Sequence, residues 1–187
     1  MNEEIENKPE FNFNNFFKQN KLKILTVFVL AIFLVFTIII IDEYKKKQNI
    51  DISEKYNRAK ILIEKNKSLE SLKLLEEIIL KKNIFYSPSA LNLIIDNKMI
   101  EDKQKVLTYF EEVLSNSNLD LETKNLFTFK KVIYIGGDIS ENDLLNYLKP
   151  ILQSDSLWKN TVTDYIKKYY LSKGEFNKAK EFEVLKN

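Results

Sequence analysis

Residues 24–41 read ILTVFVLAIFLVFTIIII, a run of eighteen residues without a charged side chain. Its only polar side chains are the hydroxyls of Thr26 and Thr37. As an α-helix this run rises about 27 Å, close to the roughly 30 Å of a bilayer's hydrocarbon core. A single segment satisfies its backbone hydrogen bonds in lipid only as a helix. We therefore predict a transmembrane helix from Ile24 to Ile41, with a tail of residues 1–23 before it and a domain of residues 42–187 after it.

A buried core helix and a cleaved signal peptide both fit this segment less well. The buried core helix of a soluble protein rarely lacks a polar stripe over such a length. A cleaved signal peptide has a shorter apolar core, of about 7–15 residues, and ends in small residues. Here Asp42, Glu43 and Tyr44 follow the apolar run, with no small-x-small site. We interpret the segment as an uncleaved anchor.

The sequence around the anchor does not orient it. Three lysines precede it and three follow, so the positive-inside rule is balanced: Lys18, Lys21, Lys23, Lys45, Lys46 and Lys47. The tail also contains FNFNNFF, Phe11–Phe17, which is either an interfacial aromatic stretch or a short linear motif for a partner. From the residues alone, the orientation and the role of this stretch both stay open.

The composition argues against catalysis and against nucleic-acid binding. The chain of 187 residues has no His and no Cys, the usual residues of zinc sites, catalytic triads and thiol chemistry. A net charge of +2 is too small to indicate a nucleic-acid partner. The paired carboxylates Glu76-Glu77 and Glu111-Glu112 occupy adjacent helical positions, which point about 100° apart. We expect a protein that is not an enzyme and that binds no cofactor, metal or small-molecule substrate.

The rest of the chain has the helical period of apolar residues and no strand-like alternation. Turn and capping signals divide it into helices of roughly 10–20 residues. The expected helix starts are at Asp51 with Glu54, Ser68, Ser87 with Pro88, Asp120, Ser140 with Asp143, and Ser154 to Ser156. The expected ends are at Leu80, Gly136-Gly137 and Gly174, and Pro150 is expected to kink or end its helix near Lys149. These signals predict an all-α domain of about eight helices.

A repeat underlies these helices. Leu72, Leu75, Ile78 and Ile79 recur as Leu107, Phe110, Val113 and Leu114, as Leu145, Leu148, Ile151 and Leu152, and as Ala179, Phe182 and Leu185. The successive offsets are 35, 38 and 34 residues. A period near 34 is that of tetratricopeptide-type αα-hairpins, which bury a continuous core only when they stack. We therefore expect a tetratricopeptide-like solenoid.

Two segments carry a resemblance to a known family. One is Leu144–Leu152, followed by Leu157-Trp158, and the other is Tyr169–Ala179, in which Gly174 ends one helix and Phe176 fills the corner before the next. With the single span, they resemble the bacterial inner-membrane proteins with a tetratricopeptide repeat-like domain, the YfgM-like ancillary subunits of the Sec translocon. The resemblance implies a cytoplasmic N-terminus, a periplasmic domain, and association with the translocon and with periplasmic chaperones.

Five residues are candidates for a partner-binding groove. Tyr165 and Tyr169 lie on the first helix expected in the last hairpin, and Phe127, Lys130 and Tyr134 lie on the equivalent helix of the hairpin before it. Lys130 and Tyr134 are four residues apart and share a helical face. Such residues either line a concave groove for a peptide or take part in ordinary hairpin packing.

The predicted function is that of a membrane-tethered protein-binding scaffold on the periplasmic face of the inner membrane, with other proteins and lipid as its partners. The alternative is a self-associating bitopic structural protein of the cell envelope. That alternative needs a coiled coil over Tyr44–Lys65, where sustained heptads are few.

Overall fold

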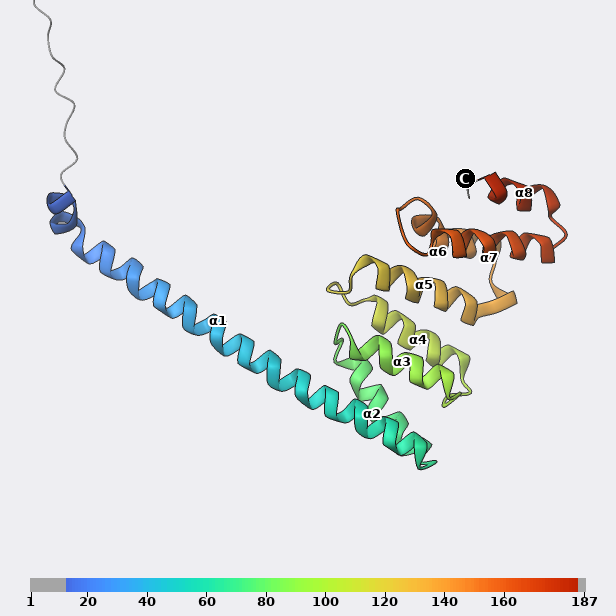
Figure 1. The fold of residues 1–187 in the computed structure, drawn as a ribbon, viewed down its shortest axis with the longest axis horizontal. Helices are drawn as coiled ribbons and strands as arrows, with labels where there is room; N and C mark the ends of the chain where they lie inside the picture. The colour runs from blue at the N-terminus through green and yellow to red at the C-terminus, as the bar shows by residue number, and fades with distance from the viewer. Residues whose placement is uncertain (1–12, 185–187) are drawn as a thin grey trace, which may run out of the picture. The chain divides into compact units, whose positions relative to one another are not determined.

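The computed structural model describes the backbone of residues 13–184 and the side chains of residue 18 and residues 20–182. Within these residues the protein is all-α, as predicted, and contains no strand. The helices are α1 (Phe13–Glu64), α2 (Ser68–Leu80), α3 (Tyr86–Asp96), α4 (Lys103–Leu114), α5 (Leu121–Ile135), α6 (Glu141–Leu152), α7 (Lys159–Ser172) and α8 (Phe176–Val184), with the 3₁₀ turn η1 (Gly136–Asp138) between α5 and α6 (Figure 1). The side chains of the Phe11–Phe17 stretch, with the role predicted for it, lie outside the described residues.

The chain divides into two compact units, of which the first ends at Ile50 and the second begins at Asp51. This division comes later than the boundary predicted after Ile41. In the first unit, residues 24–41 lie within α1, and none of their side chains is buried against another part of the described chain. The hydroxyls of Thr26 and Thr37 donate to the carbonyl oxygens of Leu22 and Phe33, each at 2.9 Å. The segment is thus long and apolar enough to cross a membrane, with both of its polar side chains satisfied internally.

The second unit begins within α1. No helix starts at Asp51. The expected cap there is wrong: α1 runs through this position to Glu64, and the Asp51 carboxylate pairs with Lys55 at 3.5 Å. An N-cap forms only where the preceding turn is not helical, and here the preceding residues already are. The eight helical segments of the domain are therefore the end of α1 and α2 to α8.

These segments form four antiparallel hairpins, which follow one another along the domain (Figure 1). The end of α1 pairs with α2, α3 with α4, α5 with α6, and α7 with α8. Polar contacts join residues about one predicted repeat apart. The Tyr109 hydroxyl donates to Glu76 at 2.8 Å, and the Ser156 hydroxyl donates to Glu122 at 3.0 Å. Such contacts are what stacked hairpins require, because each repeat packs on its neighbour in the sequence.

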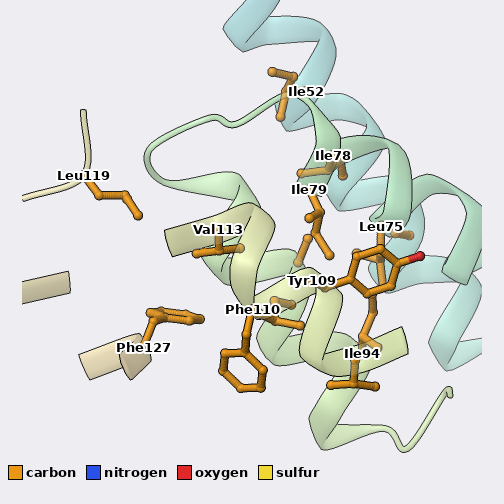
Figure 2. Packing of buried hydrophobic residues seen from close by; sticks show 14 residues of the cluster. Ile52, Leu75, Ile78, Ile79, Ile94, Tyr109, Phe110, Val113, Leu119 and Phe127 are labelled. Carbon is orange, nitrogen blue, oxygen red and sulfur yellow. The ribbon is translucent and has the colours of Figure 1, made fainter. Parts of the chain in front are cut away.

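The first part of the core lies between the end of α1 and α5. Figure 2 shows Ile52 of α1 with Ile78 and Ile79 of α2, and Phe110 of α4 with Phe127 of α5. Small side chains allow the helices to approach closely there: the buried Ser71 hydroxyl donates to the Ala59 carbonyl oxygen at 2.9 Å, and the buried Ser87 hydroxyl donates to that of Ile78 at 2.7 Å.

The second part of the core is built by α5 to α8. Its fully or nearly fully buried members include Val132, Leu144, Leu148, Ile151, Val162, Ile166, Tyr170 and Ala179. Trp158 is partly buried against this cluster, at the N-cap position of α7. Several predicted repeat positions, among them Leu75, Ile78, Phe110, Val113, Leu148, Ile151 and Ala179, are buried in one cluster or the other.

Some of the predicted helix ends are confirmed. The Asp120 carboxylate caps α5 by accepting from the Thr123 backbone N–H at 2.9 Å, and the Ser140 hydroxyl caps α6 by accepting from that of Asp143 at 3.1 Å. Gly136 and Gly174 have positive φ angles of 68° and 77°, which a side chain would strain.

Other predicted ends are wrong by a few residues. Lys67, not Ser68, is the N-cap position of α2, and Phe85, not the buried Ser87, is that of α3. Asn83 Oδ1 accepts from the backbone N–H groups of Phe85 and Tyr86 at the start of α3. α7 begins at Lys159, later than the predicted Ser154–Ser156. Of the two outcomes expected at Pro150, an end near Lys149 is wrong: α6 continues to Leu152, because a proline in the last turn removes only one hydrogen bond, at an exposed position.

A candidate partner-binding cavity between α3, α4 and α5

A cavity of about 170 Å³ lies on the domain between three helices. Asn92, Ile95 and Asp96 of α3, Phe110 of α4, and Lys130, Ile133 and Tyr134 of α5 line it. Its size is well below the roughly 300–1,000 Å³ of small-molecule pockets and close to the roughly 150 Å³ that hold a single benzene ring. The cavity therefore fits one side chain better than it fits a metabolite.

Lys130 and Tyr134 are in the cavity because α5 presents them one turn apart on the same face. The Lys130 ammonium donates a hydrogen bond to Asn92 Oδ1 at 2.8 Å, which links α5 to α3 across 38 residues of sequence. The same ammonium lies 5.4 Å from the centroid of the Phe127 ring. These contacts hold the cation at the rim of the cavity.

The floor of the cavity is aromatic. The Phe110 ring is fully buried, and its centroid lies 5.8 Å from that of Tyr134 and 6.4 Å from that of Phe127. Phe127 itself is only 2% exposed and does not line the cavity. The structure thus places this predicted groove residue in the core beneath the cavity, where it supports Phe110 and Lys130.

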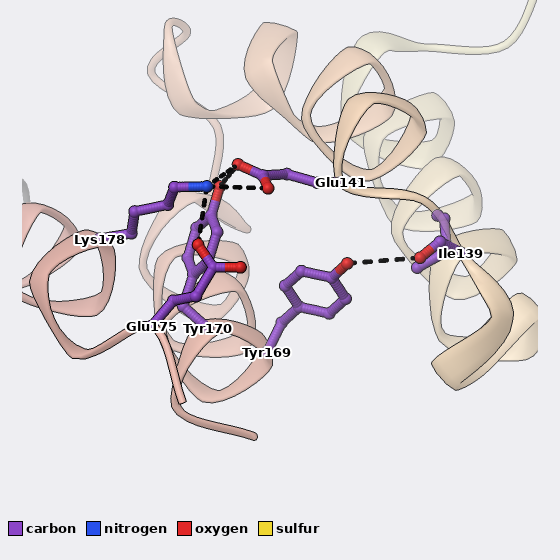
Figure 3. A network of polar contacts seen from close by, with 6 residues as sticks. All are labelled: Ile139, Glu141, Tyr169, Tyr170, Glu175 and Lys178. Atoms are coloured by element: carbon purple, nitrogen blue, oxygen red, sulfur yellow. Dashed lines mark hydrogen bonds and ion pairs between the residues drawn. The ribbon is translucent and has the colours of Figure 1, made fainter. Parts of the chain in front are cut away.

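Tyr165 and Tyr169 lie elsewhere in the domain. The Tyr165 ring packs edge-on against Phe129 at 5.4 Å, and burial, followed by the charge of Tyr169, raises the pKa of Tyr165. The Tyr169 hydroxyl donates to the Ile139 carbonyl oxygen at 3.4 Å (Figure 3). Because Phe127 and Phe129 are two residues apart, they point to nearly opposite faces of α5. The structure therefore does not bring the five predicted residues into a single groove.

Sequence reasoning missed the α3 side of the cavity. Asn92 and Asp96 are four residues apart and share a face, as Lys130 and Tyr134 do, and Asn92 precedes Lys130 by one repeat of 38 residues. Aligning the first helices of the hairpins, as well as the second ones, would have identified Asn92 and Asp96, because Asn92 then falls on Lys130 and Asp96 on Tyr134.

The lysine next to Lys130 has a different environment. Lys131 points between α4, α5 and α6, where its ammonium pairs with the Glu111 carboxylate and donates to the Tyr147 hydroxyl at 2.9 Å. Burial lowers the pKa of Lys131, but the hydrogen bonds that its ammonium donates to Glu111 and Tyr147 outweigh burial, so the pKa lies above its ordinary value. Lys131 is thus a charged structural residue in the interior of the domain.

A second polar network holds the last hairpin. The Lys178 ammonium contacts both carboxylate oxygens of Glu141, at 2.7 and 2.9 Å, and pairs with Glu175 at 2.7 Å (Figure 3). The Tyr170 hydroxyl donates to Glu141 at 3.0 Å. The Lys178 and Tyr170 hydrogen bonds lower the pKa of Glu141, while burial, followed by the Glu141 contact, raises that of Tyr170 to about 12. These residues connect α6 to α7 and α8.

Within the described residues, no group of three or more acidic, His or Cys side chains is arranged to hold a metal ion. Comparisons of the chain with protein-family models, with curated proteins and with solved structures find no match. The cavity between α3, α4 and α5 is accordingly the candidate site by its own geometry.

Proposed function

We propose that this protein is a membrane-tethered scaffold that binds segments of other proteins and carries out no reaction. Two features support the proposal. The apolar segment of α1 is suited to hold the chain in a bilayer, and the domain presents a cavity of about 170 Å³ with an aromatic floor and a charged rim. Stacked αα-hairpins, here proposed to be tetratricopeptide-like, form extended surfaces of this kind.

The tether itself contributes to binding. A domain held near a membrane meets membrane-proximal partners at a high effective concentration, so that weak contacts suffice. A cavity that takes one side chain is consistent with weak, reversible docking.

We further propose that the domain lies on the periplasmic face of a bacterial inner membrane. The support is the layout of the chain and its resemblance to the inner-membrane tetratricopeptide-like family, which make translocon subunits and periplasmic chaperones the first partners to examine. Protease treatment of spheroplasts tests the side. We expect digestion of the domain in intact spheroplasts, and protection until lysis would reject this location.

The cavity is the observation that carries the proposed function, and photo-crosslinking in intact membranes tests it. A benzoylphenylalanine in place of Ile133, a cavity residue that is 48% exposed, should give discrete adducts with other proteins. The same group in place of Leu69, which is 78% exposed on α2 and does not line the cavity, is the matched control. Identical adducts from both positions, or none from Ile133, would count against partner binding in the cavity.

A further inference from the structure

The rim of the cavity has two chemically different ends. At one end the Lys130 ammonium uses one of its three N–H donors on Asn92 Oδ1, at 2.8 Å, and the Asn92 amide adds N–H donors of its own. Within the described residues, neither side chain makes a salt bridge. This end is positive and rich in donors, so it suits a carboxylate.

The other end lies one helical turn farther along. Asp96 follows Asn92 by four residues on α3, and Tyr134 follows Lys130 by four on α5, a rise of about 6 Å. α3 and α5 run in the same direction, since each is the first helix of its hairpin (Figure 1). The Asp96 carboxylate is exposed and, in the described part of the chain, forms no ion pair. This end is negative and suits a cation.

Between the two ends the cavity is apolar. Ile95 and Ile133 line it together with the buried Phe110 ring, and the volume accommodates one aliphatic side chain. An acidic ligand alone meets repulsion from Asp96, and a basic ligand alone meets repulsion from Lys130.

We propose, on the basis of the proposed function, that the cavity recognises a peptide segment that presents one aliphatic side chain between an acidic and a basic side chain. The aliphatic side chain enters the cavity over Phe110. The carboxylate contacts Lys130 and Asn92, and the cation contacts Asp96. Specificity comes from the paired charges, and the aliphatic group supplies the anchor.

Fluorescence anisotropy on the full-length protein, in nanodiscs of uncharged lipid, tests the proposal. Four labelled peptides of equal length, with Gly-Ser flanks, carry the centres Glu-Leu-Lys, Lys-Leu-Lys, Glu-Leu-Glu and Glu-Gly-Lys. We expect the Glu-Leu-Lys peptide to bind at least about threefold more tightly than either like-charged peptide, and the glycine peptide to bind at least about tenfold more weakly, because its anchor is missing.

Charge reversal at each end should change the preferred peptide. With Lys130→Glu the Lys-Leu-Lys peptide should bind best, and with Asp96→Lys the Glu-Leu-Glu peptide should. Lys73→Glu, at an exposed position of α2 outside the cavity, is the control and should keep the original order. Circular dichroism establishes that all three variants keep their helical content.

The results separate this proposal from the proposed function. An unchanged order of affinities in both cavity variants, equal affinities for all four peptides, or no binding at millimolar peptide would overturn the charge recognition. If crosslinks from the Ile133 position persist in that case, partner binding in the cavity stands and only the peptide chemistry falls. If those crosslinks are also absent, both proposals fall.

Discussion

Replacing Glu111 by Gln should destabilise the protein more than replacing Lys131 by Met. The Lys131 side chain is only 5% exposed, whereas that of its partner Glu111 is 63% exposed. The Lys131 ammonium also donates to the Tyr147 hydroxyl at 2.9 Å and lies 4.1 Å from the centroid of its ring. Glu111→Gln thus leaves a buried cation with fewer partners, whereas Lys131→Met removes the buried cation altogether.

The magnitudes follow from the exposure of the two partners. Breaking a fully buried pair costs about 3–5 kcal/mol, but water screens the mostly exposed Glu111, so we expect Glu111→Gln to lower the free energy of unfolding by about 1–2 kcal/mol. Lys131→Met loses the hydrogen bonds and the cation–π contact of the ammonium. It also removes the cost of burying that charge, and the Met side chain fills nearly the same volume as the aliphatic part of Lys131. We expect a change of less than about 1 kcal/mol. In the Lys131→Met background, Glu111→Gln should cost less than about 0.5 kcal/mol.

Urea unfolding of the full-length protein in detergent measures these differences. Trp158 is the only tryptophan and is partly buried against the second core cluster, so its fluorescence reports the unfolding of that region. An unchanged slope with urea shows that the midpoints compare the same transition. Two results would refute the argument that water screens the Lys131–Glu111 pair: a loss of about 3 kcal/mol or more in the free energy of unfolding for Lys131→Met, or additive losses for the two substitutions.

Four further outcomes are expected. The pKa of Glu141 is lowered in the folded protein, so its contribution to stability is present above the ordinary pKa of about 4.3 and is lost as the pH falls through the lower folded pKa. The urea concentration at the midpoint of unfolding, followed by Trp158 fluorescence, should therefore be lower at pH 3 than at pH 7. Glu141→Gln should reduce that difference. Burial, followed by the hydrogen bond to Glu76, raises the pKa of Tyr109 to about 12, so the contribution of Tyr109 to stability is complete below pH 10 and is lost as the pH rises toward 12. In an ultraviolet titration, the Tyr109→Phe variant should lack one tyrosine that ionises late. Loss of a tyrosine that ionises early would contradict this. Lys98, at a φ of 48°, should gain about 0.5–1 kcal/mol of stability on replacement by Gly, measured by urea unfolding followed by circular dichroism, and a loss would show that its backbone is not strained. In the same assay, Ser71→Leu should lower the free energy of unfolding by about 1–3 kcal/mol, because the larger side chain overpacks the contact with the Ala59 backbone. Ser71→Ala should lower it by less. Equal losses for the two variants would show that the helices do not approach closely at this position.

Features that depend on a few neighbouring residues could be predicted from the sequence. The apolar run of residues 24–41, the caps at Asp120 and Ser140, and the stops at Gly136 and Gly174 are local, because a cap or a left-handed turn involves residues only two to five apart. The repeat was visible because the apolar period of the second helices recurs at nearly constant offsets.

The predictions that were wrong depend on neighbours that the local signal does not contain. The cap expected at Asp51 did not form because the helix from the preceding segment already continues through it. Ser87 has the sequence of a cap, but its hydroxyl is used on the Ile78 carbonyl oxygen of the adjacent helix.

The sequence by itself determined that the chain is helical, has one apolar segment long enough for a bilayer and repeats with a period near 35 residues. Only the tertiary structure decided which face of α5 meets α3 and which meets α6. That choice places Lys130 at an open cavity with Asn92, buries the adjacent Lys131 against Glu111 and Tyr147, and hides Phe127 beneath the site. The physical reason is that a cavity is formed by residues a whole repeat apart in the sequence, whose pairing is set by the packing of three helices and not by the hydrogen bonds within any one of them.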